Sequence, residues 1–319
     1  MPRIMIQDLQ TGQAVEQPFL VHEKELRTTR TGSLYITTEL GDRTGRIPAR
    51  MWDATQQVFD SFQPDDFVRV KGRVETYKGR LQLIVEAIEP SRDAEIDIAD
   101  FLPATNKDVA AMYARLIEIA KMVKRPGLRK LLASFLKDAQ FSARFRKAPA
   151  AVRYHHAFLG GLLEHTLGVA EMAVAVAERY PDLDGDMLLT GVILHDIGKI
   201  EEFSYDRAFS YSDSGGLLGH LYIGSRMIEE RAAGIDELGR SDTEALVHLM
   251  LSHHGEYEYQ SPKLPMTAEA MTVHFLDNLD AKLNAFRSAM LDDRDPENHW
   301  TEWNRMFERR LFKGHDRAD

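Results

Sequence analysis

The chain of 319 residues contains no cysteine. Disulfides and thiolate zinc sites are therefore excluded, and any metal must be held by histidine, aspartate or glutamate. This composition is compatible with a reducing compartment, and we expect a cytoplasmic protein. Long apolar runs are missing too, because stretches such as residues 187–194 are far too short to span a bilayer. We expect a soluble protein with no membrane partner.

A general excess of positive charge is also missing, since the formal net charge is -10 at pH 7. This argues against a uniformly basic nucleic-acid binder. Residues 1–92 nevertheless hold 13 Lys+Arg and 13 Asp+Glu, which leaves 27 of the 40 basic and 37 of the 50 acidic residues for the remainder. The negative excess lies beyond residue 92, which indicates two differently charged modules.

Residues 1–90 are typical of a small β-barrel. Strand-like runs alternate with turn signals such as Pro64-Asp65-Asp66 and Lys78-Gly79. Five antiparallel strands at this spacing favour a five-stranded OB-fold barrel. The run 42–53 also resembles the glycine-containing hairpin of the anticodon-binding type of OB-fold. The predicted strands are 19–22, 33–37, 46–52, 67–74 and 81–85.

An OB-fold commonly binds single strands through aromatic stacking and a basic groove. The candidate nucleic-acid contacts combine stacking and basic side chains. They are Tyr35, Arg69, Lys71, Arg73, Tyr77, Lys78 and Arg80. A solvated strand face is the alternative for the basic run. Trp52 and Phe67 are further stacking candidates, or simply core residues.

Beyond the barrel, residues 91–106 lose the alternation and predict a linker that packs through Phe101 and Leu102. Residues 107–295 predict an all-α bundle, so the fold class is α+β with two domains. After a first helix that ends at Pro126-Gly127, helices are expected at about 128–146, 160–179, 186–198, 218–232, 242–254 and 267–290. Residues 296–319 form a tail whose aromatic side chains are expected to dock.

The histidines are clustered, because only His22 of the 12 precedes residue 150. Five of them lie on or at the end of predicted helices, and a helical bundle can turn such residues inward to one point. These five are His165, His195, His220, His253 and His254. A single histidine on a helix is more often an ordinary core or surface residue. We keep that interpretation for His22, His248, His299 and His315.

Asp196 strengthens the case for a metal. It directly follows the apolar run 187–194 and would be costly to bury without a charge partner. A ligand set of imidazole and carboxylate without sulfur favours manganese, iron, cobalt or zinc over copper(I). Two divalent ions are expected, because Asp196 can bridge them and a water between them becomes the nucleophile for attack on phosphorus. The predicted reaction is phosphoester hydrolysis.

Here the sequence resembles a known superfamily. His165, His195-Asp196 and Asp277 resemble the signature of the HD phosphohydrolases, over about residues 150–290. The two-metal subset of that superfamily implies two ligand sets. One is His165, His195, Asp196 and Asp277, and the other is Asp196, His220, His253 and His254. Asp280 is the alternative to Asp277, and either member of the His253-His254 pair has the substrate as an alternative partner.

Three residues are candidates for catalysis, namely Asp196, Lys199 and His156. Lys199 follows Asp196 by three residues and is expected to hold a phosphate oxygen, or else to be a solvated lysine at a helix end. His156 precedes the His165 helix with Arg153 and His155, where these side chains line the cleft or support it. Residues 256–265 are expected to form a substrate lip or a plain surface loop.

The combination resembles a narrower family. The barrel, the linker 100–108 and the segment 155–165 together resemble the YhaM family of bacterial 3′-to-5′ exoribonucleases over nearly the whole chain. This resemblance implies that the barrel grips single-stranded RNA or DNA and feeds its 3′ end to a manganese-supported centre, which releases nucleoside monophosphates. A phosphohydrolase of small nucleotides with a regulatory barrel and a non-catalytic single-strand-binding protein are the alternatives. A homo-oligomer stays open.

Overall fold

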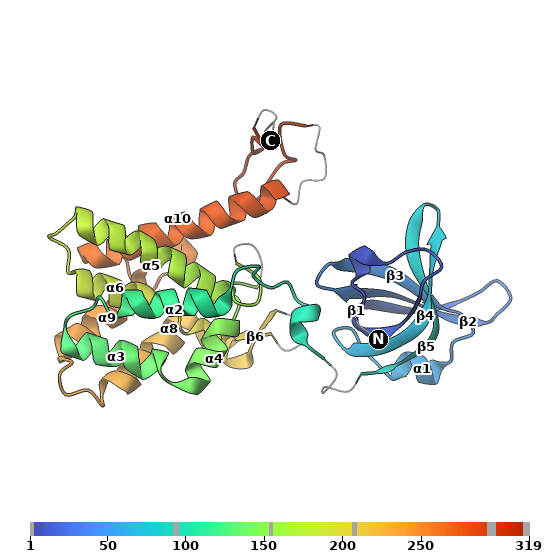
Figure 1. The fold of residues 1–319 in the computed structure, drawn as a ribbon, viewed down its shortest axis with the longest axis horizontal. Helices are drawn as coiled ribbons and strands as arrows, with labels where there is room; N and C mark the ends of the chain where they lie inside the picture. Colours follow the sequence, from blue (N-terminus) through green and yellow to red (C-terminus); the bar gives the residue numbers. More distant parts are fainter. Residues whose placement is uncertain (1–2, 92–95, 153–155, 206–208, 292–297, 315–319) are drawn as a thin grey trace. The chain divides into compact units, whose positions relative to one another are not determined.

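The computed structural model describes residues 3–91, 96–152, 156–205, 209–291 and 298–314. The chain forms two compact units (Figure 1): of the described residues, the first contains those up to Ala104 together with Tyr205, and the second contains the rest, from Thr105 onward. The first unit is a β-barrel and the second is helical. No helix in these described ranges is long and apolar enough to cross a membrane.

The barrel consists of β1 (Ala14–Thr28), β2 (Leu34–Asp42), β3 (Gly45–Met51), β4 (Phe67–Tyr77) and β5 (Arg80–Pro90). It closes in the order β1-β2-β3-β5-β4, with β3 and β5 parallel and the other pairs antiparallel. A short helix, α1 (Gln56–Asp60), connects β3 to β4. The predicted five-stranded OB-like barrel is confirmed, although four of its strands are longer than the predicted runs and β3 begins one residue earlier.

The alternation along β4 separates the barrel core from its surface. Val68, Val70 and Val74 are fully buried, whereas Lys71 and Arg73 between them are exposed. Period-two alternation places successive side chains on opposite faces, so the basic residues of β4 point outward. Beyond β5, the 3-10 helix η3 (Ile98–Asp100) leads to a buried Phe101. The Phe101 ring packs 4.7 Å from that of Phe67, so this end of the linker is attached to the barrel.

The second unit is a helical bundle, as predicted. Its helices are α2 (Val109–Ala120), α3 (Pro126–Leu136), α4 (Ala139–Lys147), α5 (Gly161–Arg179), α6 (Gly185–Leu194), α7 (Lys199–Glu202), α8 (Asp213–Ala232), α9 (Arg240–Ser252) and α10 (Ala268–Leu291). A two-stranded ribbon, β6 (Phe203–Ser204) and β7 (Ser210–Tyr211), lies between α7 and α8.

One predicted helix is wrong. Residues 128–146 form two helices, because Asp138 interrupts the run and caps the second. Its carboxylate accepts hydrogen bonds from the backbone N–H groups of Gln140 and Phe141, at 2.9 and 3.1 Å. An aspartate at this position satisfies donors that a new helix leaves unpaired. Pro126, in turn, occupies the first turn of α3, where its missing N–H costs nothing.

Helix α6 is the central helix of the helical unit, and all of its residues from Met187 to Leu194 are buried. It packs against α5, α9 and α10, and α10 runs along α5 (Figure 1). Gly191 lets α9 approach closely, because a Cβ there would lie 2.8 Å from a methyl carbon of Leu249. The C-terminal end of this buried helix delivers the His195-Asp196 pair to the centre of the bundle.

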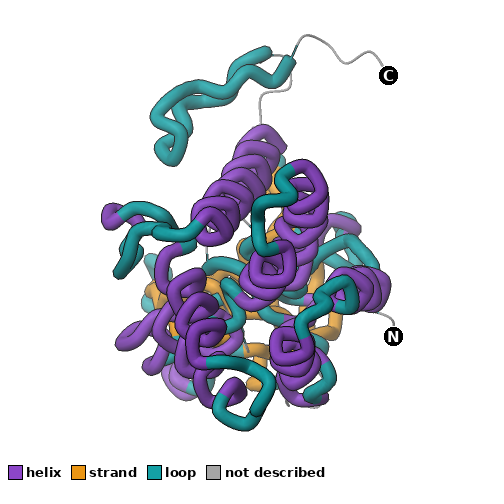
Figure 2. The backbone as a smooth tube through the Cα atoms, turned by 90° about the vertical axis from the view of Figure 1, so that its left-hand side faces the viewer, coloured by secondary structure: helices purple, strands orange, loops and turns teal. Residues whose placement is uncertain are grey.

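The described part of the C-terminal tail, residues 298–314, is a loop that lies beyond the end of α10 (Figure 2). Phe307 contacts Phe286 of α10, with ring centroids 5.5 Å apart, and Leu311 is buried. Trp300 and Trp303 remain largely exposed. The expected docking therefore rests on Phe307, not on the tryptophans.

Candidate metal centre

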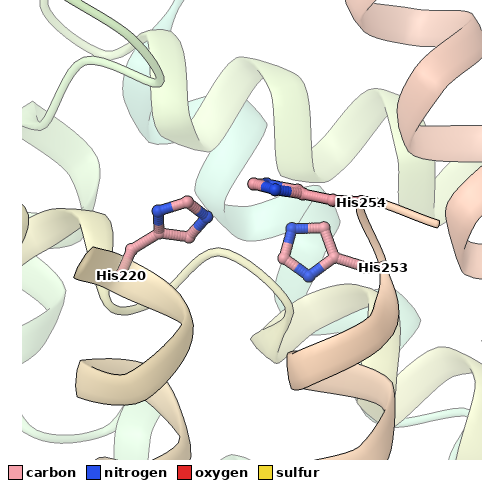
Figure 3. A group of neighbouring side chains, drawn as sticks. All are labelled: His220, His253 and His254. Atoms are coloured by element: carbon pink, nitrogen blue, oxygen red, sulfur yellow. The ribbon is translucent and has the colours of Figure 1, made fainter. Parts of the chain in front are cut away.

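Five helical segments bring the predicted ligands to one point. His165 lies in α5, His220 in α8 and Asp277 in α10, while His195-Asp196 and His253-His254 stand at the C-terminal ends of α6 and α9. Asp196 is only 1% exposed and His165 is fully buried. Figure 3 shows His220, His253 and His254 turned toward one another from α8 and from the end of α9.

The first group of donors surrounds the Oδ2 atom of Asp196. His165 Nε2 lies 3.1 Å from His195 Nε2, 3.2 Å from Asp277 Oδ1 and 3.6 Å from Asp196 Oδ2. His195 Nε2 lies 3.4 Å from the same Asp196 oxygen. Donors that are each about 2.1 Å from one ion stand about 3.0 to 3.4 Å apart at right or tetrahedral angles. Three of these distances match that spacing, while the 3.6 Å distance and the 3.9 Å between His195 Nε2 and Asp277 Oδ1 are longer, so an ion would draw the four atoms slightly closer together.

The second group surrounds the other oxygen of the same carboxylate. Asp196 Oδ1 lies 3.5 Å from His253 Nε2 and 3.6 Å from His220 Nε2. Ligand atoms of His220, His253 and His254 all lie within 4.8 Å of one another. Asp196 thus presents one oxygen to each group, which is the arrangement of a bridging carboxylate.

Two buried atoms in this centre lack hydrogen-bond partners among the described residues, namely Asp196 Oδ1 and His220 Nε2. Buried polar atoms are nearly always paired, so such an exception needs an explanation. A cation between these two atoms would satisfy both, since one carries negative charge and the other offers a lone pair. The residues present therefore fit a divalent metal.

The Nδ1 atoms of the five candidate histidines all make the same kind of contact. Each Nδ1 atom contacts an oxygen that can only accept, so Nδ1 carries a hydrogen and Nε2 is the ring nitrogen that would bind a metal. The acceptors are Asp280 for His165 (2.7 Å), the Val192 carbonyl for His195 (2.7 Å), Glu202 for His220 (3.0 Å), the Met250 carbonyl for His253 (2.9 Å) and the Tyr259 carbonyl for His254 (2.8 Å).

Charge and burial shift the pKa values of this centre strongly. Burial lowers the pKa of His195 to about 4. Burial also acts to lower the pKa of His165, but hydrogen bonds to Asp277 and Asp280 raise it to about 9. Burial raises the pKa of Asp196, yet the charges of Lys199 and His195 outweigh it and hold that pKa well below the usual range. The carboxylate is charged, as a metal ligand must be.

Lys199 is buried, and its Nζ atom donates a 2.6 Å hydrogen bond to Asp196 Oδ2. The alternative of a solvated lysine at a helix end is therefore wrong. Burial tends to lower the pKa of this ammonium, but the charges of Asp196 and Asp277 raise it overall. Lys199 is thus a fixed positive charge beside the candidate ligands.

His156 lies behind the centre, not in it. Its Nε2 atom lies 2.9 Å from Asp280 Oδ2, the oxygen that also contacts His165 Nδ1. The structure therefore places Asp277 on the inner side of the His165 ring and Asp280 on its outer side. His156 has a left-handed φ of 47°, and its backbone N–H donates to the side chain of Asn284. The neighbouring predictions Arg153 and His155 lie outside the described residues.

The predicted lip, residues 256–265, contains the 3-10 helix η4 (Tyr257–Tyr259), whose two tyrosine side chains are exposed. Its connection to the centre is the bond between the Tyr259 carbonyl and His254. Sequence reasoning missed Glu202 and Asn284 as supports of the centre. A carboxylate three residues beyond Lys199 was the available signal, since Asp196, Lys199 and Glu202 recur at one helical spacing.

The barrel carries an aromatic cluster in which Trp52 and Tyr77 are exposed and Tyr35 is half-buried. The Tyr35 and Trp52 rings lie 5.0 Å apart, and the Arg50 guanidinium lies 5.9 Å from the Trp52 ring and 5.4 Å from that of Tyr77. Lys78 Nζ lies 5.5 Å from the Tyr77 ring. Trp52 is 45% exposed, so the alternative of a core residue is wrong for Trp52. This cluster adjoins β2 and β3, the strands through which OB-folds bind single strands.

The other candidate nucleic-acid contacts differ in how exposed their side chains are. Arg73 and Lys71 point outward from β4, with Lys71 3.9 Å from Glu86. Arg80 is exposed at the start of β5, and Arg69 is half-buried. Arg50 was missed, because its β3 position becomes an aromatic neighbour only when the barrel closes. Phe67 packs on Phe101 and is not a free stacking surface.

Two family models match the chain. The HD domain model matches residues 162–282, and the model of the OB-fold nucleic acid binding domain matches residues 20–91. The first match contains all of the candidate ligands, and the second contains the aromatic cluster. Fold and site together define an HD-domain protein with an attached nucleic-acid-binding barrel.

Relatives narrow this class. The chain is 36% identical to the 3′-5′ exoribonuclease YhaM of Bacillus subtilis (strain 168) over 95% of both chains. It is 35% identical to that of Bacillus licheniformis, covering 95% of this chain and 97% of the relative, and 33% identical to that of Geobacillus sp. (strain WCH70), covering 95% and 92%. The chain belongs to the YhaM family of 3′-5′ exoribonucleases, which confirms the resemblance.

Proposed function

We propose that this protein is a metal-dependent 3′-5′ exoribonuclease that removes nucleoside monophosphates from single-stranded RNA. The observation that carries the proposal is Asp196, which presents its two oxygens to two separate groups of imidazole and carboxylate donors. Membership of the YhaM family supports the polarity and the substrate. Single-stranded DNA is a second substrate to be tested.

The proposed ligands are His165, His195, Asp196 and Asp277 for one ion and Asp196, His220, His253 and His254 for the other. Divalent ions held there supply Lewis-acid activation of the phosphodiester and of a water nucleophile. Manganese is favoured, with iron, cobalt and zinc as alternatives that the same donors accept. The Nδ1 hydrogen bonds of the histidines would direct each Nε2 atom toward the metal, and at His165, whose pKa is raised to about 9, the metal would first displace a proton.

Lys199 is proposed to stabilise the charge of the scissile phosphate. Its ammonium is buried beside Asp196, and charge-assisted hydrogen bonds are strongest where water is excluded. His156 is proposed to act through Asp280, since it touches no candidate ligand atom on the inner side of the His165 ring. This changes its expected role from catalysis to support.

The barrel is proposed to grip the single strand. Tyr35, Trp52 and Tyr77 offer stacking surfaces for bases, and Arg50 adds charge beside them. The outward basic side chains extend the contact to phosphates. They are Arg69, Lys71, Arg73, Lys78 and Arg80. A cytoplasmic location and a homo-oligomer stay predictions.

The test is degradation of an oligoribonucleotide labelled at its 5′ end, with manganese present. Wild type should produce a ladder that shortens from the 3′ end and release nucleoside monophosphates. Asp196→Ala should leave the oligonucleotide intact, whereas Asp236→Ala, at an exposed carboxylate away from the centre, should behave as wild type. An intact oligonucleotide alongside hydrolysis of small nucleotides by wild type would instead support a small-nucleotide hydrolase.

A further inference from the structure

The two groups of candidate ligands share one feature of their outer supports. Three of the five histidines donate Nδ1–H to backbone carbonyls. The other two donate to carboxylates, His165 to Asp280 and His220 to Glu202. Each group on either side of Asp196 therefore contains a single histidine supported by a carboxylate.

Glu202 is held more tightly than a chance neighbour would be. It is only 6% exposed, and its Oε1 atom accepts both the backbone N–H and the ring Nδ1–H of His220, each at 3.0 Å. Two bonds from one residue to one oxygen restrain the backbone position of His220 and the rotation of its ring. The Nε2 atom of that ring, which has no hydrogen-bond partner within the described part of the chain, is consequently held toward Asp196 Oδ1, 3.6 Å away.

The backbone of α7 and α8 is shaped to allow this contact. Gly219 has φ 72° and ψ 156°, a conformation that only glycine adopts readily, and it breaks α8 just before His220. A Cβ on Gly215 would lie 2.1 Å from the Glu202 carbonyl oxygen, and one on Gly198 would lie 2.1 Å from that of His220. Three glycines thus permit the close approach that brings Glu202 to His220.

We propose that Glu202 is a positioning residue that sets the metal affinity of the group formed by Asp196, His220, His253 and His254, and that Asp280 does the same for the group that contains His165. Without Glu202, the His220 ring is free to rotate and to carry its hydrogen on Nε2, where it blocks coordination. Loss of such a support typically weakens metal affinity about 10-fold to 100-fold. The inference rests on the proposed two-metal function.

The experiment measures Mn²⁺ binding to the full chain. Calorimetric titration gives stoichiometry and affinity, and electron paramagnetic resonance distinguishes a coupled Mn²⁺ pair from a single ion. Wild type should bind two ions per chain with a coupled signal. Glu202→Ala should retain one ion with near wild-type affinity, weaken the other about 10-fold to 100-fold, and show the signal of an isolated ion. Asp280→Ala should weaken the other member of the pair.

Two variants control for general damage. Glu201→Gln changes the adjacent carboxylate, which faces Arg226 at the surface, and should bind both ions as wild type does. Glu202→Gln keeps an oxygen acceptor and should recover part of the lost affinity. If Glu202→Ala does not fold, Glu202→Gln provides the test through a smaller loss at one ion only.

Two coupled ions with wild-type affinity in the Glu202 variants would overturn the inference while leaving the proposed function intact. Weakening of both ions equally would also overturn it, because Glu202 would then act on the fold and not on one group. Wild type that binds fewer than two ions would contradict the two-metal proposal itself. The wild-type titration thus separates the two failures.

Discussion

The barrel and the helical unit present their functional side chains in opposite ways. The aromatic cluster of the barrel is largely exposed and comes from β2, the end of β3 and the end of β4. Five of the seven candidate ligands are buried, while Asp277 and His254 are half-buried, and the set is drawn from α5, α6, α8, α9 and α10, more than 100 residues of chain. Single substitutions in the barrel should therefore weaken RNA binding only in part. A single substitution in the metal centre, which depends on the whole bundle, should abolish hydrolysis.

The largest expected effect comes from metal removal. A strong chelator should abolish hydrolysis, because the proposed mechanism depends on divalent ions to activate both the water and the phosphodiester. Binding of a labelled oligoribonucleotide, followed by fluorescence anisotropy in the same sample, should persist, since the aromatic cluster contains no candidate ligand. Unchanged hydrolysis in the presence of chelator would contradict the assignment of hydrolysis to a metal centre in the helical unit and of RNA binding to the barrel.

The next effect concerns stability. Lys199→Met leaves the buried Asp196 carboxylate without its ammonium partner, and breaking a buried pair costs about 3 kcal/mol. Urea unfolding in the presence of chelator should show this decrease in the free energy of unfolding. Mn²⁺ should restore much of the lost free energy, because it replaces the missing positive charge. Lys130→Met, at an exposed pair with Glu237, is the matched control and should cost no more than about 1 kcal/mol. Equal losses in both variants would contradict the account.

A smaller effect is expected at the barrel. Trp52→Ala should weaken RNA binding by about 2 kcal/mol, or roughly 30-fold, because one stacking surface is lost. KM for a long oligonucleotide should rise while kcat stays near wild type. Trp303→Ala removes another exposed tryptophan, in the C-terminal tail, and serves as the control. A fall in kcat with unchanged KM would place Trp52 in the reaction instead of in binding.

The smallest effect, counted per pH unit, is a dependence of metal affinity on pH. Because the pKa of His165 is raised to about 9, the metal-free protein holds a proton there at neutral pH, and a metal must displace it. Affinity for Mn²⁺ should therefore rise with pH, by up to about tenfold per pH unit below 9. Calorimetry at three pH values measures it, with buffers of different ionisation enthalpy reporting the released proton. Affinity that is flat between pH 6.5 and 8.5 would contradict this assignment.

The same contrast explains what the sequence could predict. The sequence predicted the burial of Asp196, because this residue follows an apolar run. It also predicted that the histidines meet, because the helices of a bundle can turn them inward. Asp277 and Asp280 could not be separated, because residues three apart share a helix face; only packing places them on opposite sides of the His165 ring.

Other details depended on three-dimensional closure. In the sequence, Glu202 is one of several charged residues near Lys199. Its contact with His220 depends on the close approach that the glycines of α8 allow. Arg50 looked like any strand residue, until barrel closure placed it between Trp52 and Tyr77. The break at Asp138 was missed because the capping role of an aspartate competes with the apolar period around it.

The central claim is that Asp196 bridges two metal ions, and anomalous diffraction from crystals grown with Mn²⁺ tests it most directly. The account predicts two peaks about 3.5 to 4 Å apart, one beside each oxygen of Asp196, with His165 and His195 at the first and His220 and His253 at the second. A single peak, or peaks that do not contact Asp196, would contradict it.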